Sequence, residues 1–141
     1  MNIRDIRIGN LIIDKETSES GIIGEVVGTN CFTDQITIFT KHEGVTDRYD
    51  IGALQAYGIP ISEDWLVKLG FSRKDYKEGH IGIDFKTKSL HSDFALRIEE
   101  FGIIYELREY FIVTLEYVHE LQNLFHVITS QELTIKEGKG E

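Results

Sequence analysis

The chain has 141 residues, of which 41% are hydrophobic and 28% are charged, and its formal net charge at pH 7 is −9. That length suits one domain or two small lobes that fold without a metal or disulfide. The single cysteine, Cys31, excludes an internal disulfide framework and suits a reducing compartment. With no secretory signal and no apolar run long enough to span a membrane, the sequence predicts a cytoplasmic protein with Cys31 as a buried free thiol.

The negative charge is spread along the whole chain. Residues 1–58 hold five basic and nine acidic side chains, a net charge of −4, and the remaining residues hold ten and fifteen, a net charge of −5. Both halves therefore repel phosphate backbones on average, which disfavours nonspecific binding of nucleic acid. A nucleic-acid site would need a local basic patch.

The first 58 residues are predicted to form short strands separated by glycine-rich turns. Apolar or alternating segments occur at residues 11–13, 21–28, 35–39 and 45–51. In the last of these, Val45, Tyr49 and Ile51 share one face of an extended strand. The spacing predicts a β-rich lobe over residues 1–58, as a small twisted sheet or an SH3-like barrel.

A short helix with both ends marked in the sequence is predicted over residues 62–69. Pro60 fixes an extended backbone before it, and Ser62 is a good N-cap residue. Two acidic residues then suit the positive end of the helix dipole. At the other end, Gly70 can adopt the left-handed conformation that terminates a helix. The segment connects two β-rich regions.

The second half is predicted to be an α+β lobe over residues 59–135. Alternating apolar residues indicate strands around residues 81–85, 94–98, 103–107 and 110–115. They favour a four-stranded antiparallel meander with one face covered by an amphipathic helix over residues 117–128. The polar, glycine-rich residues 136–141 are predicted to be a disordered tail. The fold class expected for the whole chain is α+β.

The C-terminal helix separates into two faces. At about 100° per residue, its apolar side chains fall within an arc of about 120° and its polar ones lie opposite. The polar face is therefore predicted to be solvated and is a candidate partner-facing surface, made of His119, Gln122, Asn123 and His126. For the two amides, the favoured role is hydrogen bonding to a neighbouring loop backbone, which would tie the helix end to the sheet, and the alternative is recognition of a peptide or a base edge.

Three segments carry a resemblance to a known group of proteins. They are IRIGNL at residues 6–11, PISEDWLVKLGF at residues 60–71, and YVHELQNLF at residues 117–125 with the following TSQEL. Together they resemble a family of short uncharacterised proteins from Bacteroides-type bacteria and their phages or prophages. The resemblance spans nearly the whole chain. It implies a bacterial cytoplasmic protein linked to mobile elements, and it carries no activity, cofactor or catalytic residue.

The known catalytic and metal-binding patterns do not match this sequence. The zinc-protease helix motif needs a second histidine four residues after His119, and that position holds Asn123. His126 lies about 10 Å further along the helix axis, too far for one metal to bridge directly. Neither a nucleophile elbow nor a Walker-type loop occurs. We therefore expect no catalytic residue, no cofactor and no metal.

The aromatic side chains offer a second candidate surface. At strand and helix spacing, aromatics usually pack in a core. Their alternative role is an exposed patch for self-association or partner binding, made of Trp65, Phe101, Tyr105 and Tyr110.

The leading function hypothesis is a non-catalytic protein-interaction module, an accessory protein of phages or mobile elements, with an unidentified protein partner or a second copy. The alternative is association with nucleic acid through the SH3-like lobe, with Arg7 or Arg48 offsetting the acidity. Third comes a small-molecule enzyme whose site is not visible in sequence.

Overall fold

The protein is described from a computed structural model that covers residues 1–141. The described part excludes residues 16–20, 76–82, 88–94, 100–101, 108–110 and 137–141. It also excludes the side chains of His42 and of residues 72–95, 97–102 and 104–112. The chain divides into two compact units. The N-terminal unit is Met1–Ile59 with Tyr117–His119, and the C-terminal unit is Pro60–Glu116 with Glu120–Glu141.

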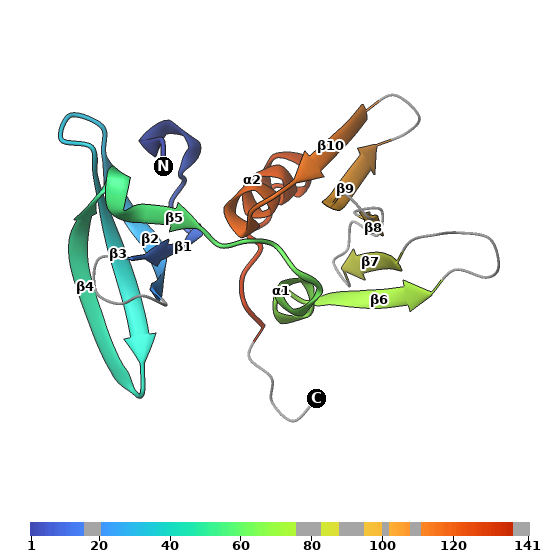
Figure 1. The fold of residues 1–141 in the computed structure, drawn as a ribbon, viewed down its shortest axis with the longest axis horizontal. Coiled ribbons are helices and arrows are strands. Elements are labelled where there is room, and N and C mark those ends of the chain that lie inside the picture. The colour runs from blue at the N-terminus through green and yellow to red at the C-terminus, as the bar shows by residue number, and fades with distance from the viewer. Residues whose placement is uncertain (16–20, 76–82, 88–94, 100–101, 108–110, 137–141) are drawn as a thin grey trace. The chain divides into compact units, whose positions relative to one another are not determined.

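The N-terminal unit is built on a five-stranded antiparallel sheet (Figure 1). Its elements are η1 (Ile3–Asp5), β1 (Leu11–Asp14), β2 (Ile22–Asn30), β3 (Gln35–His42), β4 (Val45–Gly52), η2 (Ala53–Gln55) and β5 (Ala56–Gly58). The strand order is β4-β3-β2-β1-β5, so β4 and β5 are the two edges and the sheet is open. A closed SH3-like barrel is therefore not confirmed. The short strand β5 was not predicted, because its three residues carry no alternating pattern.

Alternation along the strands places the core of this unit on one face of the sheet. In β3, Ile36 and Ile38 have no exposed surface, whereas Thr37 and Phe39, which alternate with them, are half-buried. Val26 on β2 and Ile12 on β1 are equally buried and belong to the same cluster. Burying one such side chain contributes about 1.5–3 kcal/mol. Apolar residues recur at every second position of the strand, and these are the side chains that are buried.

Strand β1 buries a polar residue at each end. Asn10, just before the strand, accepts a hydrogen bond from the Arg7 backbone on its Oδ1 atom (2.7 Å), and its own carbonyl oxygen accepts one from Val26 (2.8 Å). Asp14, the last residue of β1, accepts a hydrogen bond from the Tyr49 hydroxyl (2.9 Å). Both side chains are fully buried. Hydrogen bonding offsets the cost of burying them.

Strands β3 and β4 form a hairpin with a two-residue turn. Glu43 and Gly44 both have positive φ, 50° and 79°, between the paired residues His42 and Val45. Two successive left-handed residues form the type of turn whose twist matches paired antiparallel strands. The turn therefore fixes the register of β4 against β3 along all eight pairs of the ladder.

The C-terminal unit contains a second five-stranded antiparallel sheet, in the order β10-β9-β8-β7-β6. Its elements are α1 (Glu63–Lys68), β6 (Phe71–Asp75), β7 (Ile83–Thr87), β8 (Ala95–Glu99), β9 (Gly102–Leu107), β10 (Phe111–Leu115) and α2 (Val118–Thr129). The prediction of four strands is wrong, because β6 pairs with β7 and adds a fifth. With one apolar residue followed by four polar ones, FSRKD gave no strand signal. The α+β fold class is confirmed.

One face of this sheet carries its buried residues. Leu115 pairs with Ile103 in the ladder between β10 and β9, and Leu96 lies on the same face two residues from the partner of Ile103. All three are buried, as is Phe71 on β6. Directly opposed residues of antiparallel strands share a face. The register therefore places these four buried residues on the same face of the sheet.

The helix α1 begins and ends as the sequence predicts. The Ser62 hydroxyl oxygen accepts a hydrogen bond from the Trp65 N–H (3.3 Å), and Gly70 has a φ of 92°. Lys136, placed in the predicted disordered tail, instead donates its N–H to the Lys68 carbonyl oxygen at the end of α1 (2.8 Å). The rest of that tail, residues 137–141, lies outside the described residues. Within the described part of the chain, no helix is long and apolar enough to cross a bilayer.

Replacement of the N-cap tests this account of α1. Ser62→Ala is expected to lower the free energy of unfolding by about 1 kcal/mol, because the Trp65 N–H loses its partner. Chemical denaturation monitored by circular dichroism measures the change. Ser62→Asp, which keeps an acceptor at the N-cap, is the matched control and should unfold like the original chain. Equal destabilisation by both substitutions would contradict a capping role.

Candidate functional surface of the N-terminal unit

The N-terminal unit has an open hollow of about 510 Å³. Three segments line it: residues 1–3 before and within η1, residues 33–34 in the turn between β2 and β3, and residues 52–55 around η2. Hollows of a few hundred cubic ångströms are where proteins bind small ligands or the side chains of a partner.

The register of the β3–β4 ladder brings two of these segments together. Gln35 at the start of β3 pairs with Gly52 at the end of β4, so the residues just outside the ladder are neighbours. The Ala53 N–H donates to the Asp34 carbonyl oxygen (2.8 Å), and the Gly52 N–H donates to the Gln55 side-chain oxygen (3.0 Å). The Met1 amino group joins the third segment by donating to the Ala53 carbonyl oxygen (3.1 Å). The hollow therefore has a hydrogen-bonded backbone frame.

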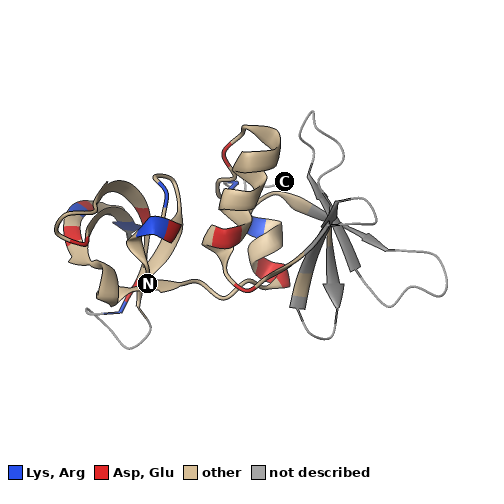
Figure 2. Cartoon of the chain, turned by 90° about the horizontal axis from the view of Figure 1, so that it is seen from above, with Lys and Arg blue, Asp and Glu red and all other residues tan. Residues whose placement is uncertain are grey.

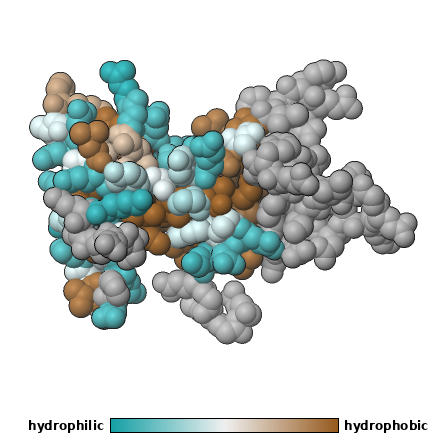
Figure 3. Space-filling model, in the orientation of Figure 1, coloured by the Kyte–Doolittle hydropathy of each residue, from teal (hydrophilic) through white to brown (hydrophobic). Residues whose placement is uncertain are grey.

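Two large apolar side chains of this unit are almost fully exposed. Leu54 lines the hollow and is 87% exposed. Phe32 does not line it but lies two residues before the lining residue Asp34, and it is fully exposed. Ala53 and Ile3, which also line the hollow, are buried in the core. Apolar side chains reach the surface of this unit at several places between polar ones (Figure 3). Single exposed apolar residues are common, whereas contiguous exposed apolar surface marks interaction sites.

Asp34 carries the one ionisable side chain among the lining residues of the hollow, all of which are in the described part of the chain. The Met1 ammonium group also belongs to the lining, so the hollow holds one negative and one positive group. Asp34 has a left-handed φ of 50°, which aspartate adopts more readily than most residues, and it is exposed. Elsewhere in the described parts, acidic and basic residues are interspersed (Figure 2). The exposed Asp34 carboxylate can pair with a basic group of a partner.

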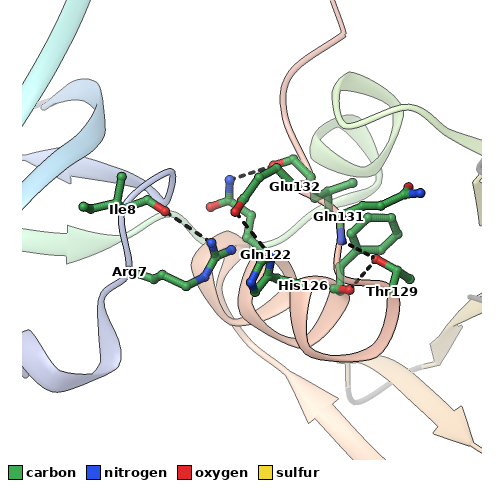
Figure 4. Close-up of polar contacts among 9 residues, drawn as sticks. Arg7, Ile8, Gln122, His126, Thr129, Gln131 and Glu132 are labelled. Atoms are coloured by element: carbon green, nitrogen blue, oxygen red, sulfur yellow. Dashed lines mark hydrogen bonds and ion pairs between the residues drawn. The ribbon is translucent and has the colours of Figure 1, made fainter.

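The C-terminal helix buries two residues of its polar face. His119 is only 5% exposed, so the prediction that it is solvated is wrong. Gln122 is only 1% exposed, and its amide donates to the Leu133 carbonyl oxygen (2.9 Å), because residues after α2 return along the helix (Figure 4). Hydrogen bonding to backbone, the role favoured for this amide, is therefore observed, with the segment after the helix as the acceptor and not with the sheet.

The other two residues of that face are half-buried. Asn123 is of intermediate exposure, and His126 has its Nδ1 atom 3.3 Å from a Glu132 carboxylate oxygen. Nearby, the Thr129 hydroxyl donates to the Phe125 carbonyl oxygen (2.7 Å) and accepts a hydrogen bond from the Gln131 N–H (3.2 Å), which closes the helix end (Figure 4). His126 is thus engaged with the segment after α2.

His119 belongs to a packed stack in the N-terminal unit. Its ring lies 5.7 Å from the ring of Tyr117 at an interplanar angle of 15°. A Cβ atom built on Gly58 would lie 2.6 Å from the Tyr117 ring and 3.1 Å from His119, so the glycine permits this close approach. The Ile59 carbonyl oxygen accepts a hydrogen bond from Val118 beside it (2.9 Å). Packing on β5, which was not predicted, explains why His119 is buried.

Most of the candidate aromatic surface lies outside the described residues. Trp65 is half-buried, with the Lys68 ammonium 4.7 Å from the centre of its ring. The side chains of Phe101, Tyr105 and Tyr110 lie outside the described part. Cys31, predicted to be buried, is exposed in the turn between β2 and β3. Among the described residues, no three His, Cys, Asp or Glu side chains could together hold a metal ion.

Comparisons with known proteins add no relative. A scan against protein-family models found no match, and searches of curated proteins and of solved structures found no significant match. The resemblance to short proteins of Bacteroides-type bacteria and their phages stays a prediction.

Neither Phe32 nor Leu54 was singled out from the sequence as a surface residue. Phe32 is a large aromatic in the polar segment NCFTD, between two predicted strands. An aromatic in a turn cannot follow the alternation that buries strand residues, and that was an available signal of exposure. Leu54 gave no comparable signal, because its exposure depends on η2, a single turn of 3-10 helix.

Substitution of Gln122 distinguishes a structural role from a partner-binding one. Gln122→Ala is expected to lower the free energy of unfolding by about 1–3 kcal/mol, because it removes the donor to a buried carbonyl oxygen. Thermal or chemical denaturation measures the change. Val127→Ala, on the exposed side of the same helix, is the control and should change stability by less than about 0.5 kcal/mol. Equal stability of both variants would contradict a structural role for Gln122.

Proposed function

We propose that the protein is a non-catalytic protein-interaction module whose N-terminal unit binds a protein partner at the hollow lined by Leu54, with Phe32 as a second contact. The observation that carries the proposal is the near-complete exposure of Leu54, which lines the hollow, and of Phe32, which lies two residues before the lining residue Asp34. Covering them on binding would remove apolar surface from water at about 25 cal/mol per Å². Large aromatic and aliphatic anchors of this kind dominate the energetics of many interfaces.

The net charge of the N-terminal unit favours a protein over a nucleic acid. Residues 1–58 carry a net charge of −4, and Asp34 is an exposed lining residue of the hollow. A phosphate backbone approaching this surface would meet repulsion, whereas a partner with a basic side chain next to an apolar one would satisfy both Asp34 and Phe32.

The same unit is proposed to be an SH3-like lobe. Two features support this: β1 to β4 form a consecutive antiparallel meander, and β5 follows a single 3-10 turn and returns to pair with β1. The register shift between Val26 and Gly28 is a bulge of the kind that bends a strand in a small barrel. Linkage to phages or mobile elements rests on the sequence resemblance.

The test compares the partners recovered by three forms of the chain. The double variant Phe32→Ser/Leu54→Ser is expected to fold normally, because both side chains are exposed, and to lose a partner that the original chain retains. The control, Val67→Ser/Val127→Ser, changes two exposed apolar residues of the C-terminal unit. Mass spectrometry of affinity-purified complexes identifies the partner, and calorimetry with the purified partner then measures affinity.

The expected outcome is a loss of affinity of at least about tenfold for the double variant and no loss for the control. A partner that binds all three forms equally would overturn the assignment of this surface. Recovery of no protein partner by the original chain would overturn the function itself.

A further inference from the structure

Strand β4 presents a long backbone edge. It has β3 on one side and no strand on the other in the described sheet (Figure 1). It spans the eight residues Val45–Gly52, and its side chains are exposed from Val45 to Arg48 and again at Asp50. An edge of this length can pair with another strand, and charged side chains ordinarily prevent such pairing. Whether the charges of β4 prevent or favour pairing depends on which residues of an added strand lie opposite them.

Symmetry restricts how two copies of β4 can pair. Two identical antiparallel strands side by side are related by a two-fold axis perpendicular to the sheet, which keeps each face on its own side. Directly opposed residues share a face, and faces alternate along a strand. An even-numbered residue can therefore oppose only an even-numbered residue of the second copy, and an odd-numbered residue only an odd-numbered one. In each possible register one residue lies at the two-fold axis and opposes its own copy, and the register is said to be centred on that residue.

The charge pattern separates these registers. Centring the pair on Asp47, Arg48 or Asp50 would place that charge opposite its own copy, which is repulsive. Centring it on Tyr49 instead places Arg48 of each copy opposite Asp50 of the other, twice by symmetry. No like charges are then directly opposed, and residues 46–52 of each copy are paired. The one register with complementary charges is also one that uses nearly the whole strand.

Both charges are available for such contacts. Arg48 and Asp50 are exposed and lie on the same face of β4. Their neighbours on β3 are Phe39 and Thr37, neither of which is charged. Asp50 accepts a hydrogen bond from the Thr37 hydroxyl, and no ion pair of Arg48 or Asp50 occurs among the described residues.

We propose that the chain self-associates through antiparallel pairing of two β4 edges centred on Tyr49, with two reciprocal contacts between Arg48 and Asp50. The sheets of two N-terminal units would then continue into one another. This pairing goes beyond the function proposed above, because it needs no partner at the hollow and involves neither Phe32 nor Leu54. The two proposals can therefore fail separately.

Reversing the charges of Arg48 and Asp50, one at a time and together, tests the proposed pairing. Sedimentation equilibrium of the full chain is expected to show a reversible dimer. Arg48→Asp alone and Asp50→Arg alone should each weaken it by roughly tenfold or more, because both attractive contacts become repulsive. The double variant Arg48→Asp/Asp50→Arg should restore the dimer. A mixture of the two single variants should form a heterodimer, since each then supplies the charges that the other needs.

Arg4→Asp, which makes the same charge change at an exposed site on η1, is the control and should leave the dimer unchanged. Thermal denaturation of each variant checks folding, and the double variant and the mixture keep the test decisive if one single variant is destabilised. A strictly monomeric original chain would overturn the proposal. So would a dimer that neither reversal weakens, or single variants whose mixture and double form both stay monomeric.

Discussion

The N-terminal unit depends on strand β1, which lies between β2 and β5 and buries a polar residue at each end. Asn10 and Asp14 are both fully buried, and each is met by a hydrogen bond from elsewhere in the unit. A buried polar group without a partner would cost several kcal/mol, so these contacts restrict where the turn before β1 and the strand carrying Tyr49 can lie. Once β1 is placed, β5 can pair with it only after the chain has turned through η2.

Both proposed interaction surfaces follow from the β3–β4 hairpin. The pairing of Gln35 with Gly52 places the turn before β3 beside η2 and so forms the hollow. Because β5 continues the sheet beside β1 rather than beside β4, the same hairpin also leaves β4 as an edge. A one-residue shift of register would move Asp34 away from Ala53 and reverse the faces of Arg48 and Asp50. The hollow and the arrangement of charges on the β4 edge therefore both depend on the register of the β3–β4 hairpin.

The C-terminal helix shows that a polar residue on an amphipathic helix need not be exposed. Its two most buried polar residues, His119 and Gln122, lie on the face opposite the apolar stripe, and His119 was predicted to be solvated. Two different partners cover them: Tyr117 stacks on His119, and the segment after α2 brings Leu133 to Gln122. Helical periodicity assigns residues to faces, but it does not predict how many of those faces pack against other segments. When a second segment packs on the polar face, polar side chains there can be buried if hydrogen-bond acceptors or aromatic rings meet them.

The sequence by itself determined the local elements whose signals lie within a few residues: the alternating strands of β3 and β4, the capped helix that begins after Ser62 and ends before Gly70, and the apolar stripe of α2. The predicted lobes differ from the two compact units, because Ile59 and Tyr117–His119 belong to the first unit and were predicted in the second lobe. Tertiary structure alone decided the strands β5 and β6, the burial of His119 and Gln122, and the hollow. Each of these depends on which distant segment supplies a hydrogen bond or a packing surface, and that information is not contained in local periodicity.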